Sequence, residues 1–129
     1  MEKPDRHRIL VVDDHIDAAR SMSRVLTLLY GQDVQVAYDG PSALASVESF
    51  RPEIVFLDIG LPGMSGLDVA ASMREQAWHE LRLLVAVTGW GQEKDRQKTR
   101  EAGFDLHLVK PVKPEMIRDV LLGKIPSAH

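Results

Sequence analysis

The sequence predicts an α/β fold: a five-stranded parallel sheet with helices on both of its faces. Short apolar runs alternate with amphipathic segments of helical periodicity, and the pair recurs five times along the 129 residues. Most of the runs are apolar throughout, which is typical of parallel strands that are buried on both faces. A helix between consecutive strands is also the connection that a parallel pair requires, normally as a right-handed crossover.

The predicted strands are short and most contain no charged residue. They lie at residues 9–12, 34–38, 54–57, 83–87 and 106–109. The run from Ile54 to Leu57 combines β-branched and aromatic residues, so we expect it to be a central strand of the sheet. It ends abruptly at Asp58, and a turn-rich segment with Gly60 and Pro62 follows. Taken alone, Asp58 is as typical of a loop cap as of a functional group.

The predicted helices follow the strands at residues 18–29, 41–50, 67–73, 92–102 and 114–121. The first helix should turn Ala19, Leu26 and Leu29 toward the sheet, because they recur at helical spacing. The fourth helix is so polar that only Thr99 and Ala102 are expected to face inward. Such a helix should pack weakly.

Length and composition favour one domain with a single core. We expect a polar N-terminal leader at residues 1–7, the domain at 8–123 and a short tail at 124–129. The formal net charge of −3 argues against a nucleic-acid binder, and the lack of cysteine excludes disulfides and thiolate chemistry. No apolar run approaches the ~20 residues that span a bilayer, and the start lacks a secretory signal. A cytoplasmic protein without direct nucleic-acid or membrane contact is therefore expected.

Four of the five predicted strands end in a polar group that can do chemistry: Asp13 and Asp14, Asp58, Thr88, and Lys110. These groups should converge, because parallel strands bring their carboxyl ends to one edge of the sheet. Three carboxylates repel one another unless a cation lies between them, and Mg²⁺ prefers such oxygen ligands. A lysine and a hydroxyl suit phosphoryl oxygens, and a carboxylate can accept a phosphoryl group. The pattern predicts a site for phosphoryl transfer.

Four motifs, taken together and in this order, are highly specific. They are Val11-Val12-Asp13-Asp14, the segment from Leu57-Asp58 to Gly66, Val87-Thr88-Gly89 and Val109-Lys110-Pro111. With them the chain resembles the receiver domain of two-component response regulators over essentially its whole length. The resemblance implies the flavodoxin-like (βα)5 receiver fold, which agrees with the alternation of strands and helices.

The resemblance also implies the roles at the site. Asp58 would accept the phosphoryl group from a histidine kinase or a histidine phosphotransfer domain, and Thr88 and Lys110 would hold the phosphoryl oxygens. The cofactor would be Mg²⁺. Its ligands would be Asp14, Asp58 and the backbone carbonyl of Gly60, with Asp13 acting largely through water.

One departure from the family's pattern concerns the conformational switch that the resemblance implies. Where the family often carries Tyr or Phe, three residues before the lysine, this chain has His107. His107 is either a half-buried surface histidine or the partner of Thr88 in the switch. Histidine, unlike Tyr or Phe, gains a proton near neutral pH, so a switch built on it could respond to pH.

We therefore expect a signalling module that assists its own aspartyl phosphorylation and dephosphorylation, not a turnover enzyme. Two alternatives remain open: a small Rossmann-like phosphatase with Asp58 as nucleophile, and a pseudo-receiver that is never phosphorylated. The implied partners are a kinase or phosphotransfer domain upstream, and a downstream protein or a fused output domain that this chain does not contain. A homodimer that forms on phosphorylation is also compatible with the resemblance.

Overall fold

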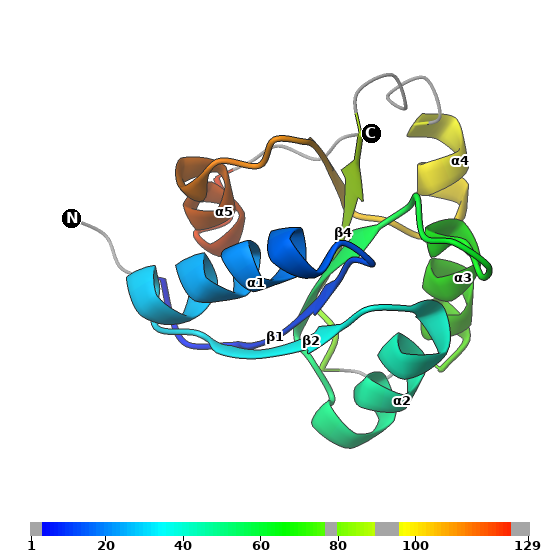
Figure 1. Cartoon of the computed structure of the whole chain (residues 1–129), viewed down its shortest axis with the longest axis horizontal. Coiled ribbons are helices and arrows are strands. Elements are labelled where there is room, and N and C mark those ends of the chain that lie inside the picture. Colours follow the sequence, from blue (N-terminus) through cyan, green and yellow to red (C-terminus); the bar gives the residue numbers. More distant parts are fainter. Residues whose placement is uncertain (1–3, 77–79, 90–95, 125–129) are drawn as a thin grey trace.

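The predicted sheet is confirmed in the computed structural model, which describes residues 4–76, 80–89 and 96–124 (Figure 1). Five parallel strands pair in the order β2-β1-β3-β4-β5. They are β1 (Arg8–Val12), β2 (Asp33–Ala37), β3 (Ile54–Asp58), β4 (Leu83–Thr88) and β5 (Leu106–Val109). β3 is central, as predicted, and all five of its residues are buried.

Helices cover both faces of the sheet (Figure 1). One face carries α1 (Ile16–Arg24), its continuation η1 (Val25–Leu29), and α5 (Pro114–Leu121). The other carries α2 (Gly40–Phe50) and α3 (Gly66–Gln76), with α4 (Arg96–Glu101) beyond α3 at the edge. Side chains of β3 alternate between two apolar clusters: Val55 and Leu57 pack toward α2 and α3, and Ile54 and Phe56 toward α1 and α5. Burial on both sides explains why this strand has no polar residue before its end.

The prediction that Leu29 faces the sheet is wrong. The last turn after α1 is a π-helix, Val25–Leu29, with a wider turn than the α-helical spacing assumed from the sequence. The wider turn shifts the phase of the apolar stripe, so Leu26 is fully buried whereas Leu29 is 57% exposed and Leu28 is 79% exposed.

The other helices begin and end close to the predicted places. Asp39 caps α2 by accepting a hydrogen bond from the Ser42 N–H at 2.8 Å. In the fourth helix only residues 96–101 are described as helical, and the predicted turn at 92–95 lies outside the described residues. Thr99 is buried there, as predicted.

No helix within the described ranges is long and apolar enough to cross a membrane.

Candidate functional site

The carboxyl edge of the sheet positions the predicted site residues. Asp13 directly follows β1, and its N–H donates to the carbonyl of Ala37 at the end of β2. Asp58 and Thr88 are the last residues of β3 and β4. Lys110 follows β5, and its N–H donates to the Thr88 carbonyl at 2.8 Å. Backbone pairing therefore holds these side chains at one edge of the sheet. The strand ends converge there, as the sequence predicts.

The Lys110 ammonium bridges two buried carboxylates. Its Nζ lies 3.1 Å from Oδ2 of Asp13 and 3.3 Å from Oδ2 of Asp58. Burial alone would lower the pKa of Lys110, but the hydrogen bond to Asp13 and the charges of both acids outweigh it, so this pKa lies above its ordinary value. Lys110 is thus a firmly charged counter-ion at the centre of the site.

The two carboxyl groups differ in how firmly they are ionised. Burial raises the pKa of Asp58 above its ordinary value; the Gly60 N–H and Lys110 offset this only in part, and the charge of Asp13 adds to it. Burial also acts to raise the pKa of Asp13, but the backbone N–H of His15 and the ammonium of Lys110 outweigh it, and the pKa of Asp13 is lowered. Asp58 is therefore the less firmly ionised of these two carboxyl groups.

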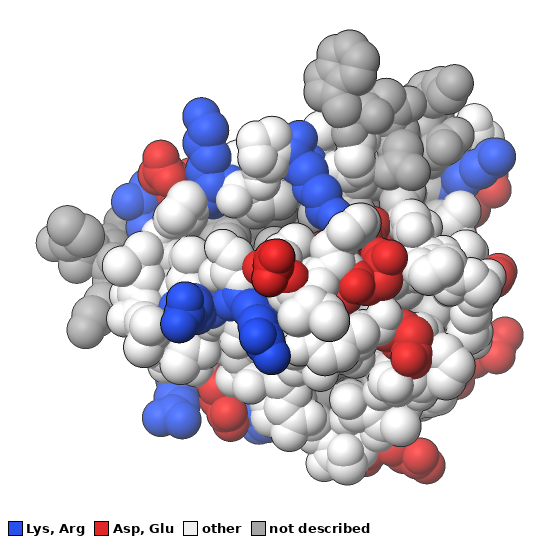
Figure 2. All heavy atoms as spheres, viewed as in Figure 1, with Lys and Arg blue, Asp and Glu red and all other residues white. Residues whose placement is uncertain are grey.

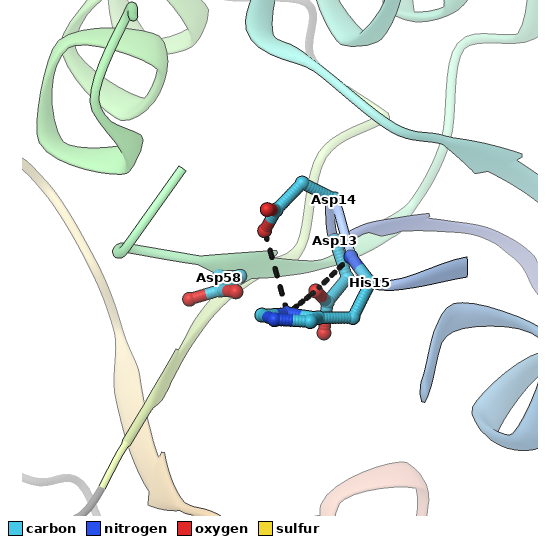
Figure 3. A group of neighbouring side chains, drawn as sticks. All are labelled: Asp13, Asp14, His15 and Asp58. Atoms are coloured by element: carbon cyan, nitrogen blue, oxygen red, sulfur yellow. Dashed lines mark hydrogen bonds and ion pairs between the residues drawn. The ribbon is translucent and has the colours of Figure 1, made fainter. Parts of the chain in front are cut away.

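A cation fits the group formed by Asp13, Asp14, His15 and Asp58 (Figure 3). Each offers one ligand atom, and these atoms all lie within 4.8 Å of one another. Oδ1 of Asp14 is buried and accepts no hydrogen bond within the described part of the chain, although Nδ1 of His15 lies 3.5 Å away. A buried carboxylate oxygen without a hydrogen bond is costly unless a cation or water satisfies it. Sequence reasoning missed His15, whose only signal is its place directly after two acids.

The loop after β3 holds Asp58 in place. The N–H of Gly60 donates to Oδ1 of Asp58 at 2.8 Å. Gly66 begins α3 against this loop: a Cβ there would lie 2.4 Å from Cα of Ile59 and 2.5 Å from the carbonyl oxygen of Asp58. Only glycine permits so close an approach. The predicted role of the Gly60 carbonyl as a metal ligand stays a prediction.

Thr88 and His107 form a second polar pair beside the carboxylates. The Thr88 hydroxyl lies 2.9 Å from Nε2 of His107, and both residues are buried. The hydroxyl is also 3.4 Å from the carbonyl oxygen of Leu108, to which it can donate. The alternative of a half-buried surface histidine is wrong, because His107 is only 9% exposed and contacts the predicted switch hydroxyl.

Charges are unevenly distributed on the face of the molecule seen in Figure 2. Basic side chains lie mainly over the half that α1 and α5 form, and acidic side chains mainly over the half that α2 and α3 form. An acidic surface attracts cations.

Fold and site together define an α/β domain with a carboxylate and lysine pocket at the carboxyl edge of its sheet. A family model described as the response regulator receiver domain matches residues 9–122. The chain belongs to this family, the receiver domains of two-component signalling systems, which are signalling modules and not classical enzymes. The phosphatase alternative is not favoured by this match.

Similar proteins and solved structures support the assignment to this family. The DNA-binding response regulator MtrA of Mycolicibacterium paratuberculosis is 40% identical over 113 residues, which are 85% of this chain and 47% of that protein. The chain thus spans about half the length of the MtrA relatives it matches. A 14.6 kDa protein of Leptolyngbya boryana is 36% identical, with 84% of its length covered. The structure of the chemotaxis protein CheY4 of Vibrio cholerae has a TM-score of 0.85 at 26% identity, covering 94% of this chain and all of that one.

Proposed function

We propose that this receiver domain takes a phosphoryl group onto Asp58 in a Mg²⁺-dependent reaction and then changes conformation to regulate a partner. The observation that carries the proposal is the placement of Asp58. It ends the central strand, contacts Lys110, and belongs to the cluster of side chains that fits a cation. Family membership supports a histidine kinase or a histidine phosphotransfer domain as the donor.

The transfer moves one phosphoryl group between two nucleophiles. The P–N bond of a phosphohistidine in the donor breaks, a P–O bond forms to a carboxylate oxygen of Asp58, and the departing imidazole takes up a proton. Before transfer, the Gly60 N–H holds Oδ1 of Asp58 and the Lys110 ammonium holds Oδ2. Afterwards, Lys110 passes to a phosphoryl oxygen while keeping Asp13, and the Thr88 hydroxyl donates to another phosphoryl oxygen.

Asp14, Asp58 and the Gly60 carbonyl would hold the Mg²⁺ ion, with Asp13 acting through water. The ion supplies positive charge that offsets the negative charge of the phosphoryl oxygens. The buried Oδ1 of Asp14, which accepts no hydrogen bond from the described residues, supports this assignment.

We infer that the same pocket assists dephosphorylation. Water then attacks phosphorus, the P–O bond to Asp58 breaks, and inorganic phosphate leaves with the carboxylate regenerated. The output would pass to a downstream protein or a linked output domain. The relative MtrA is named a DNA-binding response regulator and extends well beyond the matched region, which supports an output partner of this kind.

Phosphoryl uptake from acetyl phosphate tests the proposal. Wild type with Mg²⁺ should gain the mass of one phosphoryl group, and chelation of the metal with EDTA should prevent the gain. Asp58→Asn should stay unmodified, whereas Asp68→Asn, a control at an exposed acid in the first turn of α3, should react like wild type. A wild type that never gains mass would be a pseudo-receiver, and continuous release of phosphate from phosphomonoesters would indicate the phosphatase.

A further inference from the structure

We infer that His15 is an additional ligand of the proposed cation site and raises its affinity for divalent transition metals more than its affinity for Mg²⁺. The inference rests on the proposed function, because it takes Asp14 and Asp58 as direct oxygen ligands of that site, with Asp13 next to them. It adds a nitrogen ligand from a residue that neither the motifs nor the resemblance assigned. The chemical class it predicts is a cation that accepts imidazole, for which Co²⁺ is the probe.

The position of the imidazole carries the inference. Nδ1 of His15 lies 3.3 Å from Oδ1 of Asp13 and 3.5 Å from Oδ1 of Asp14. Ligands about 2.1 Å from a common ion lie roughly 3.0 to 3.4 Å apart when they are neighbours in its coordination sphere. In Figure 3 dashed lines join the His15 ring to the carboxylates of Asp13 and Asp14, and the carboxylate of Asp58 lies beside the ring. The 3.5 Å between His15 and Asp14, the direct ligand of the two acids, is therefore close to the spacing of neighbouring ligands.

Only a small movement would bring all four side chains within bonding distance of one ion. The four ligand atoms lie within 4.8 Å of one another, slightly more than the roughly 4.2 Å that separates opposite ligands of such an ion. The backbone of His15 is already fixed, because its N–H donates to Oδ1 of Asp13 at 2.9 Å. Its side chain is 71% exposed, so the ring has room to adjust beside the carboxylates.

The oxygen and nitrogen donors discriminate between cations. Mg²⁺ takes carboxylates, carbonyls and water, whereas imidazole suits transition metals such as Co²⁺, Ni²⁺ and Zn²⁺. Removing the imidazole should therefore weaken Co²⁺ binding much more than Mg²⁺ binding. The affinity of a site for a metal depends on ligand type and geometry together, so the absolute affinities do not isolate the role of one ligand. The decisive measurement is therefore how far each affinity falls when His15 is replaced.

Calorimetric titration of the full chain with Mg²⁺ and with Co²⁺ tests this. His15→Ala should lower Co²⁺ affinity by about tenfold or more and Mg²⁺ affinity by less than about twofold. His15→Gln keeps a polar side chain of similar reach and should behave like His15→Ala. The matched control is His7→Ala: His7 also contacts a carboxylate, with Nδ1 3.2 Å from Oε2 of Glu53, but it precedes β1 at the opposite edge of the sheet. This control should bind both cations like wild type.

Visible absorption of bound Co²⁺ gives a second readout, because loss of a nitrogen ligand changes the d–d bands. An unchanged Co²⁺ affinity and spectrum in both His15 variants would overturn the inference while leaving the oxygen site intact. An equal loss of affinity for both cations would also overturn it. A wild type that binds neither cation would instead overturn the proposed metal site itself, so the two failures are distinguishable.

Discussion

The hydroxyl of Thr88 lies 2.9 Å from Nε2 of His107 in the buried region where β4 and β5 run side by side. Thr88 ends the strand next to Asp58, and His107 stands where receiver domains often carry a switch aromatic. A hydroxyl that turns toward a phosphoryl group on Asp58 must give up this contact. We therefore expect the pair to link events at the carboxylates to the face formed by β5 and its neighbouring helices.

Thr88→Val tests how much this pair contributes to the stability of the fold. The substitution keeps the shape of the side chain but leaves a buried nitrogen of His107 without its hydroxyl partner. We expect the free energy of unfolding to fall by about 1–3 kcal/mol, the usual cost of such a loss. Thr88→Ser retains the hydroxyl and serves as the control. Urea melts that are identical for wild type and Thr88→Val would contradict the expectation.

Beryllofluoride, a mimic of the phosphoryl group, tests whether the pair is part of the switch. NMR spectra with Mg²⁺ and beryllofluoride should show shifts at the His107 ring and in α4 and α5, as well as around Asp58. A weakly packed element needs little free energy to move, so one new phosphoryl contact is enough to bias it. Shifts confined to the carboxylates and silent at His107 would mean that the signal leaves by another face.

Asp58→Asn should stabilise the protein at neutral pH. Because folding raises the pKa of Asp58, through burial above all, the folded state holds this proton more tightly than the unfolded chain does. That contribution is present at low pH and is lost as the pH rises through the raised pKa. Removing the charge should therefore raise the free energy of unfolding at neutral pH by about 0.5–2 kcal/mol, the usual gain from one stabilising substitution.

The gain from Asp58→Asn should shrink on acidification and vanish below the ordinary value of 3.8, where Asp58 is protonated in both states. Asp39→Asn is a control for which the opposite change is expected, a lower free energy of unfolding at neutral pH. The reason is that the Ser42 N–H holds the pKa of Asp39 below its ordinary value. Urea melts across acid and neutral pH measure both variants. A pH-independent difference for Asp58→Asn would show that burial of this charge is not the cause.

Asp14→Ala should abolish most of the stabilisation that Mg²⁺ brings while leaving the fold intact. The variant can even be slightly more stable without metal, because it relieves repulsion among neighbouring carboxylates. Thermal or urea melts with and without Mg²⁺ separate the two effects, since a ligand stabilises only the state that binds it. If Asp14→Ala keeps the full Mg²⁺-induced increase, Asp14 is not a ligand.

The sheet and the convergence of its strand ends were predictable because both depend on local patterns. Wholly apolar runs such as Ile54 to Leu57 indicate buried parallel strands, and parallel strands place Asp58, Thr88 and Lys110 at one edge whatever the details of packing. The π-helix at Val25–Leu29 was not predictable, since helical periodicity assumes a constant number of residues per turn. It is the reason that Leu29 is exposed.

Contacts between side chains depend on rotamers and could not be predicted from the strand pattern. The sequence placed Lys110 near three acids but did not indicate that it bridges two of them, Asp13 and Asp58. It also offered no periodic signal for His15, whose ring reaches the carboxylates because its backbone N–H is tied to Asp13. Thr88 and His107 were expected as neighbours on adjacent strands, and their direct contact is new information from the structure.

Location of the phosphoryl group by borohydride reduction tests the central claim most directly. Borohydride reduces an acyl phosphate to homoserine, which peptide mass spectrometry assigns to a single position. After reaction of the wild type with acetyl phosphate and Mg²⁺, homoserine should appear at position 58 alone, and Asp58→Asn should yield none. Homoserine at position 13 or 14 in the wild type, or full labelling of Asp58→Asn, would contradict the assignment of Asp58 as the phosphoacceptor.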